Sequence, residues 1–170
     1  MRRASSGRIL LIAGSMIAVA APGEAQVFGT GNFDVTITIV DECILTTPIS
    51  ALAFPNAGVL TAQVLGQTTI TVRCTAGTDF TLEIDEGNGA GATTLVRKMT
   101  GSGLNTATID YELYQEVGLT NIWGLDTGGN AVDLAGTGAA EAYIVYGRVP
   151  PQTTPMADTY TDTVTVTAFY

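Results

Sequence analysis

Apolar and polar side chains alternate with a period of two near both ends of the chain. Every second residue from Phe33 to Ile39 is apolar, and the residues between them are Asp or Thr. The same alternation runs from Thr163 to Ala168. Because a strand places successive side chains on opposite faces of a sheet, this spacing predicts β-strands with one apolar face. No stretch after residue 25 sustains helical spacing over three turns, so the pattern favours an all-β fold.

Composition supports short strands joined by tight turns. The chain is rich in threonine and contains 20 glycines, a mixture that suits pleated strands and turns better than helices. Together with the two terminal segments, the following strands are expected: Ile49–Phe54, Thr68–Cys74, Phe80–Asp85, Leu95–Met99, Ile109–Glu116, Ile122–Leu125 and Ala142–Val149. Many short strands with frequent turn signals predict an antiparallel, immunoglobulin-like β-sandwich.

Residues 1–25 have the pattern of a secretory signal peptide. Arginines precede an apolar run from Ile9 to Ala21, and small residues stand at the cleavage positions Gly23 and Ala25. The run is too short for the roughly 20 apolar residues that cross a bilayer, so a membrane anchor is not expected. We therefore expect the chain to be exported, with no membrane span in the mature part.

Charge and the absence of histidine exclude several functions. The chain has no histidine, and its net charge is -9 at pH 7. Histidine-dependent catalysis is therefore excluded, and the commonest metal ligand is missing. A negative charge is the wrong sign for neutralising phosphates, so nucleic acid is not an expected partner. We expect no cofactor and no metal.

Cys43 and Cys74 are the only cysteines, and both lie in the exported part of the chain. An oxidising compartment favours a disulfide between them. A redox or nucleophilic thiol would need a nearby base or a Cys-x-x-Cys spacing, and neither is present. The sequence therefore predicts one structural disulfide.

The remaining candidates for chemistry are weak. Asp126-Thr127-Gly128 matches the signature of aspartic proteases, but that chemistry needs two such carboxylates and only one copy exists. The loop from Asp85 to Gly89 breaks the calcium-loop pattern at two glycines. Other acidic residues alternate with apolar ones and are interpreted as a solvent face; they are Glu83, Asp110, Glu112 and Glu116. Trp123 is interpreted as a core or sandwich-edge residue, and no catalytic residue is assigned.

Several short motifs, taken in order, resemble the spore coat protein U family, the pilin-like domains of archaic (Csu-type) chaperone–usher pili. The motifs are Phe33–Cys43, Leu52-Ala53-Phe54, Thr71–Gly77, Arg97-Lys98-Met99, Ile109–Tyr114, Trp123-Gly124, Val145–Pro150 and the ending Tyr160–Tyr170. Two positions depart from the family pattern. Phe54-Pro55 stands where Phe-Gly is usual, and Ala157-Asp158 stands where a glycine is common.

The resemblance implies an incomplete immunoglobulin-like domain whose missing strand is supplied by another chain. It divides the sequence into a signal peptide (1–25), an N-terminal donor strand segment (26–41) and a pilin-like domain (42–170). The implied partners are a periplasmic pilus chaperone, an outer-membrane usher and other pilin subunits in a head-to-tail fibre. The resemblance implies that the protein is exported through the periplasm to the cell surface, as part of a fimbrium, or is secreted.

The resemblance also implies two sets of site residues. The donor strand would present Phe33, Val35, Ile37 and Ile39. The groove and chaperone contact would involve Val164, Val166, Ala168 and Tyr170. The implied function is that of a structural pilus subunit that polymerises by donor-strand exchange through the chaperone–usher route and supports surface adhesion or biofilm. Two alternatives remain open: a secreted coat or matrix protein, in which residues 33–40 are the domain's own first strand, and an adhesin module whose loops bind sugar or a surface. An enzyme is the weakest interpretation.

Overall fold

The computed structural model describes residue 23 and residues 28–170. The expected signal peptide therefore lies outside the described residues, apart from Gly23. The chain divides into two units, residues 1–37 and residues 38–170.

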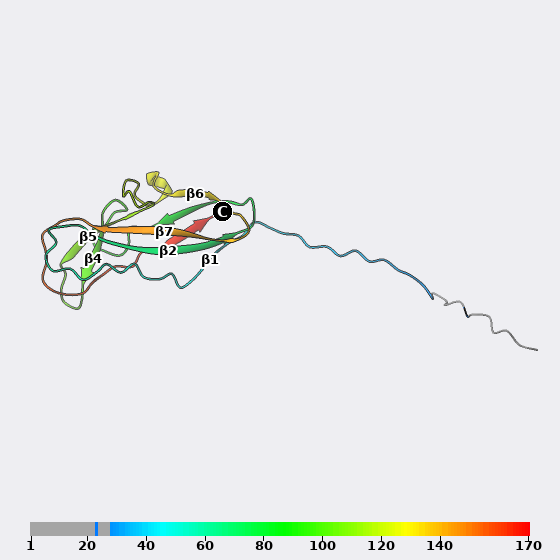
Figure 1. The fold of residues 1–170 in the computed structure, drawn as a ribbon, viewed down its shortest axis with the longest axis horizontal. Coiled ribbons are helices and arrows are strands. Elements are labelled where there is room, and N and C mark those ends of the chain that lie inside the picture. Colours follow the sequence, from blue (N-terminus) through cyan, green and yellow to red (C-terminus); the bar gives the residue numbers. More distant parts are fainter. Residues whose placement is uncertain (1–22, 24–27) are drawn as a thin grey trace, which may run out of the picture. The chain divides into compact units, whose positions relative to one another are not determined.

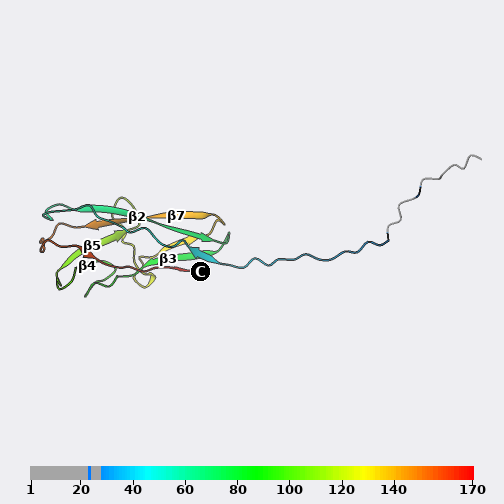
Figure 2. The same ribbon diagram turned by 90° about the horizontal axis from the view of Figure 1, so that it is seen from below.

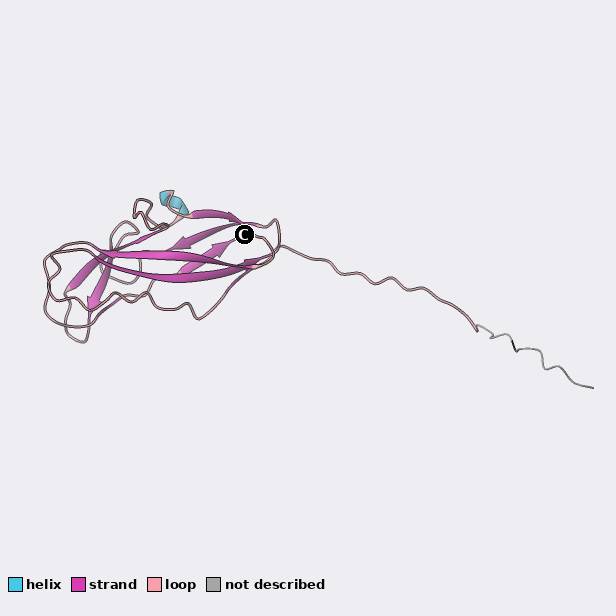
Figure 3. Ribbon diagram, viewed as in Figure 1, coloured by secondary structure: helices cyan, strands magenta, loops and turns pink. Residues whose placement is uncertain are grey.

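The second unit consists of two antiparallel sheets with one short helical turn (Figures 1 and 3). The larger sheet has the strand order β1-β2-β7-β5-β4-β8, and the smaller has the order β6-β3-β9. Their bounds are β1 Cys43–Leu45, β2 Val64–Cys74, β3 Asp79–Ile84, β4 Arg97–Gly101, β5 Thr108–Tyr114, β6 Val132–Ala135, β7 Ala140–Val149, β8 Tyr160–Thr161 and β9 Val166–Phe169. The predicted all-β antiparallel sandwich is confirmed.

The core lies between the two sheets, which Figure 2 shows with β2 and β7 in one layer and β3 in the other. Strand β3 illustrates how alternation builds it: Phe80, Leu82 and Ile84 are buried, while the residues between them face outward. Full burial of such a side chain contributes about 1.5–3 kcal/mol. Trp123 is also buried, as expected, and its indole Nε1 donates a hydrogen bond to the Leu82 carbonyl at 3.1 Å.

Most predicted strands form, with shifted ends. Strand β3 lies within one residue of its expected bounds, and β2, β5 and β7 each overlap the expected range. Strand β4 begins at Arg97 instead of Leu95, because Thr93 and Val96 pair with each other across a tight turn. Strands β1, β6 and β8 were not expected from the sequence.

Three predicted strands are wrong or too long. Ile49–Phe54 forms no strand, because it packs through its side chains, as described below. Ile122–Leu125 forms only one bridge, Tyr114 to Ile122, before the chain turns away at Gly124. The C-terminal strand begins at Val166 and not at Thr163, because the preceding residues bond to a loop instead of a strand.

Residues 28–42 form no strand, so the strand expected from Phe33 to Ile39 is absent. The four apolar side chains of the expected donor segment are between 69 and 86 % exposed; they are Phe33, Val35, Ile37 and Ile39. Such a row of exposed apolar side chains is unusual in a chain whose domain otherwise buries its alternating residues.

Candidate functional site

An apolar groove lies beside the C-terminal part of the second unit. Its inner part, about 430 Å³, is bordered on one side by residues 49–54 and on the other by residues 160–166. Its outer part, about 680 Å³, is bordered by residues 52–58 and 154–161. The two parts share Leu52, Phe54, Met99, Tyr160 and Thr161, so they form one continuous groove. Buried core side chains form the floor of its inner part: Ile70, Ile84, Tyr111, Leu113 and Val145.

One edge of the groove is held by packing instead of strand pairing. In the described part of the chain, residues 48–58 make no hydrogen bond between backbone groups. Leu52 and Phe54 instead lie directly over Gly66 of β2 and Gly147 of β7. A Cβ at Gly147 would come within 2.9 Å of both side chains, so a larger residue there would push Leu52 and Phe54 away from the sheet. The Ser50 carbonyl accepts a hydrogen bond from the Thr68 hydroxyl, and the rest of the backbone of this edge is left available to pair with an added strand.

Two aspartates hold the opposite edge, between β8 and β9. Asp162 accepts hydrogen bonds from the Tyr111 hydroxyl and the Asn88 backbone N–H, each at 2.8 Å. Asp85, at the end of β3, accepts one from the Thr165 backbone N–H at 2.8 Å. These bonds tie the non-strand residues 162–165 to the body of the sandwich. The edge therefore has a defined position although no neighbouring strand covers it.

Arg97 lies beneath this edge and is completely buried. Its guanidinium donates hydrogen bonds of 2.7–2.9 Å to four backbone carbonyls, those of Ile84, Asp85, Thr94 and Trp123. Burial lowers the pKa of the guanidinium, and the nearby Tyr111, Asp85 and Asp162 oppose that effect. Burial, followed by the bond to Asp162, raises the pKa of Tyr111. This network fixes the end of β3 and the loop after it, to which the groove edge is attached.

The structure separates the four residues that the resemblance implied for the groove and chaperone contact. Val164 and Val166 line the groove. Ala168 packs against the core and lines neither part of it. Tyr170 is 64 % exposed and borders a different, shallow hollow beside Asp79 and Phe80.

Sequence reasoning missed most of the groove's own residues. Leu52 and Phe54 were expected in a strand, and Asp162 was not singled out. Asp162 stands in the same phase of the alternation as Val164 and Val166, so an acidic residue occupies an apolar position there. This interruption was the available signal that the strand is broken near Asp162 and that its carboxylate faces the body of the sandwich.

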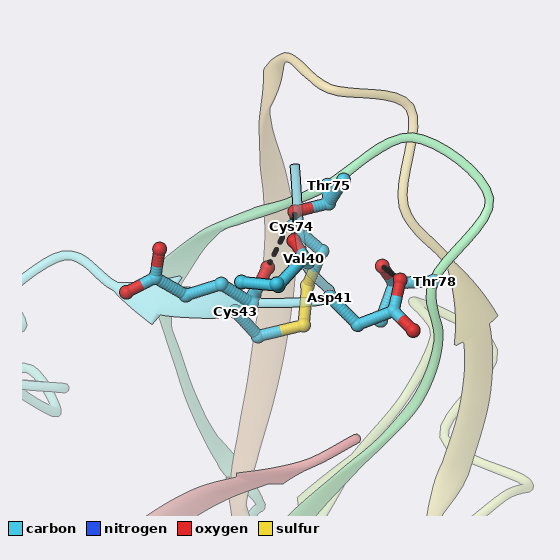
Figure 4. Close-up of a disulfide and its surroundings, with 7 residues drawn as sticks. Val40, Asp41, Cys43, Cys74, Thr75 and Thr78 are labelled. Atoms are coloured by element: carbon cyan, nitrogen blue, oxygen red, sulfur yellow. Dashed lines mark hydrogen bonds between the residues drawn. A yellow bond between two sulfur atoms is a disulfide. The ribbon is translucent and has the colours of Figure 1, made fainter. Parts of the chain in front are cut away.

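Cys43 and Cys74 form the predicted disulfide, with an S–S distance of 2.02 Å (Figure 4). The bridge joins β1 to the end of β2, where the two residues are partners in the strand register. It therefore anchors the start of the domain next to the N-terminal segment.

The other candidate sites do not assemble. Asp126–Gly128 is an exposed 3-10 turn, and Asp85 uses its carboxylate to bond loop and edge backbone groups. Asp110 is paired with Lys98 and Glu112 with Arg148, each at 2.6 Å. Among the described residues, no group of three or more His, Cys, Asp or Glu side chains could hold a metal ion. Within the same residues, no helix has the length and apolar character needed to cross a membrane.

A comparison with protein families decides the affiliation. The sequence matches the Spore Coat Protein U domain over residues 29–167. This chain belongs to the spore coat protein U family. The match to this family covers the N-terminal segment as well as the sandwich, so both are part of the unit that the family shares. No curated protein matches the chain.

Two solved structures match the chain. One is the CsuC–CsuE chaperone–tip adhesion subunit pre-assembly complex from archaic chaperone–usher Csu pili of Acinetobacter baumannii, with 17 % identity and a TM-score of 0.58 over 78 % of this chain and 41 % of the solved chain. The other is a chaperone–tip adhesin complex of CFA/I fimbriae biogenesis, with 10 % identity and a TM-score of 0.39 over 75 % and 40 %. This chain spans about two fifths of the length of the solved chains. The first likeness shows that the two-sheet fold resembles one found in a chaperone–usher pilus complex.

Proposed function

We propose that this chain is a subunit of an exported chaperone–usher pilus and that it polymerises by donor-strand exchange. The N-terminal segment of one copy fills the groove of another, after a periplasmic chaperone has filled it and an outer-membrane usher has brought the copies together. The observation that carries the proposal is the coexistence, in one chain, of an open apolar groove and an exposed segment with matching alternation. Family membership and the likeness to the Csu complex support it.

The dimensions and energetics of the two parts are compatible. The donor row is seven residues long, from Phe33 to Ile39, and the groove edge 160–166 is also seven residues long. Both span about 20 Å when extended. Four apolar side chains buried at about 1.5–3 kcal/mol each would contribute about 6–12 kcal/mol before the costs of association. The backbone of the added strand would pair with the free groove edges.

The arrangement also explains assembly into a fibre. The donor segment and the groove are different surfaces of the same chain, so the contact between copies is head-to-tail. Contacts of this kind close into rings only when the rotation permits, and otherwise they continue as filaments. Until a second chain covers it, an open groove with unpaired edges is an aggregation hazard, which gives a chaperone its role.

The test is a charge placed in the donor row. Ile37→Asp puts a carboxylate into the apolar groove and should abolish the ladder of heat-sensitive multimers of the secreted chain on a gel. Thr36→Asp is the matched control, because it adds the same charge on the opposite face of the segment and should leave the ladder intact. Both variants should keep the folded, disulfide-bonded domain.

Two results would contradict the proposal. Intact multimers of the Ile37→Asp chain would show that the segment does not fill a groove. Loss of the folded domain together with the multimers would indicate that residues 33–40 are instead a strand of the chain's own core, as a secreted coat or matrix protein would have them.

A further inference from the structure

The junction between the N-terminal segment and the sandwich is clamped by side chains that the proposed function does not use. The Thr75 hydroxyl donates a hydrogen bond to the Val40 carbonyl at 3.0 Å, and the Thr75 backbone N–H bonds the Glu42 carbonyl at 2.9 Å. The Thr78 hydroxyl donates to the Asp41 carboxylate at 3.0 Å, and Thr78 is only 5 % exposed (Figure 4). We call Val40, Asp41 and Glu42, with Thr75 and Thr78, the root clamp.

The base of the root clamp is itself fixed. Gly77 donates its backbone N–H to the Gly136 carbonyl, and Gly136 donates to the Thr78 carbonyl, both at 2.8 Å. The disulfide ties the next residue of the segment, Cys43, to Cys74, which precedes Thr75. The clamp is therefore attached to two neighbouring turns and to the end of β2.

The clamp lies where the chain would have to reverse in order to reach its own groove. The groove edge at residues 49–57 follows β1, whereas the donor row precedes β1. Strand β1 and Thr46 are bonded to β2, so a reversal that lays the donor row beside that edge must occur between Ile39 and Cys43. The three residues available for it, 40–42, are those that the clamp holds against the end of β2.

We infer that the root clamp prevents the donor segment from folding back into the groove of its own chain and so directs the segment to a second copy. This inference rests on the proposed function. Thr75 and Thr78 are then positioning residues that determine which groove is filled. Without their hydroxyl bonds, residues 40–42 are free to turn, and a closed monomer competes with the polymer.

The test uses the mature chain, refolded at high dilution with its disulfide formed, and a fluorescent peptide of residues 28–41 as the probe of an empty groove. The wild-type monomer should take up the peptide and form multimers when concentrated. Thr75→Val with Thr78→Val keeps the shape and the Thr75 backbone bond but removes both hydroxyls. It should lower peptide uptake and multimer yield together by about tenfold, the factor expected from one or two lost hydrogen bonds.

Adding Ile37→Asp to this variant should restore peptide uptake but not multimers, because the chain can no longer fill its own groove. Thr81→Val is the matched control: its hydroxyl bonds the Asp133 carboxylate at 2.8 Å on the outer face of the small sheet, and its loss should change neither readout. Asp41→Ala, at an exposed residue, should reproduce the effect of losing the Thr78 bond even where the double valine variant folds poorly.

Peptide uptake and multimer yield at wild-type levels in both clamp variants would overturn the inference. A loss of uptake that Ile37→Asp does not restore would overturn it as well, because the groove would then be damaged and not self-filled. Failure of the proposed function appears separately, as a wild-type chain that neither takes the peptide nor polymerises.

Discussion

The bond between Tyr111 and Asp162 should be a main support of the groove edge, and a double-mutant cycle can measure it. Among the described residues, the Tyr111 hydroxyl donates its hydrogen bond to Asp162, and Asp162→Ala removes this acceptor. Tyr111 is only 6 % exposed, so its hydroxyl would be left largely buried without a partner. Hydrogen bonds to charged groups contribute about 1.5–3 kcal/mol. The bond to the exposed Asn88 N–H adds less, because water replaces it. We expect Asp162→Ala to lower the free energy of unfolding by about 2–4 kcal/mol.

Tyr111→Phe removes the same bond from the other side and should cost about 1–2 kcal/mol, because Asp162 keeps its bonds to backbone N–H groups. The double variant should then cost about 1–2 kcal/mol less than the sum of the two single variants. Urea denaturation, at concentrations where size-exclusion chromatography shows a monomer, measures all four free energies.

Asp158→Ala is the control for this cycle. Asp158 accepts hydrogen bonds from Ser102, Asn105 and Thr159 but does not contact Tyr111, so its effect should add to that of Tyr111→Phe without coupling. Coupling between Asp162 and Tyr111 below about 0.5 kcal/mol would refute the reasoning, because separate sites add to within that margin. Asp162→Ala should also weaken uptake of the donor peptide, since residues 162–165 lose their attachment.

Three further predictions concern stability. Replacing Cys43 and Cys74 by alanine should lower the free energy of unfolding by about 3–4 kcal/mol, seen as a lower urea midpoint, because the bridge closes a loop of about 30 residues. Hydrogen bonds lower the pKa values of Asp158 and Glu116 to about 2, so their stabilisation is present above about pH 4.5 and is lost as pH falls through 2; Asp158→Asn should flatten that part of the pH profile of the urea midpoint. Burial, then the bond to Glu112, raises the pKa of Tyr114 to about 12, so stability should fall as pH rises from 10 through 12, and Tyr114→Phe should reduce that fall.

The alternation in the sequence was sufficient to predict the strands that face the core on one side. Strand β3 has this property along its whole length, and its bounds were predicted to within one residue. The disulfide was equally predictable, since two cysteines in a chain that is expected to be exported leave one pairing. In both cases the information is local or follows from counting.

The groove edges were not predictable in the same way, because a groove edge is defined by the lack of a neighbouring strand. Val164 on a groove edge and Val72 in the core each stand between two polar residues, and only the arrangement of the other strands distinguishes them. Arg97 posed a related difficulty. A charged residue normally indicates exposure, and the burial of Arg97 depends on four carbonyls, of which those of Ile84, Asp85 and Trp123 lie at least 12 residues away in the sequence.

The root clamp bears on why an exposed apolar segment is tolerable in such a chain. Four exposed apolar side chains would bind any apolar surface within reach, including the groove of the same molecule. Under the inferred role of the root clamp, two threonine hydroxyl bonds hold residues 40–42 against the end of β2 and keep the segment out of the groove of its own chain. The affinity of the segment for a groove can then be high, because the segment meets that groove only on another copy. On the proposed function, the strength of the fibre therefore depends on a contact that lies outside the groove.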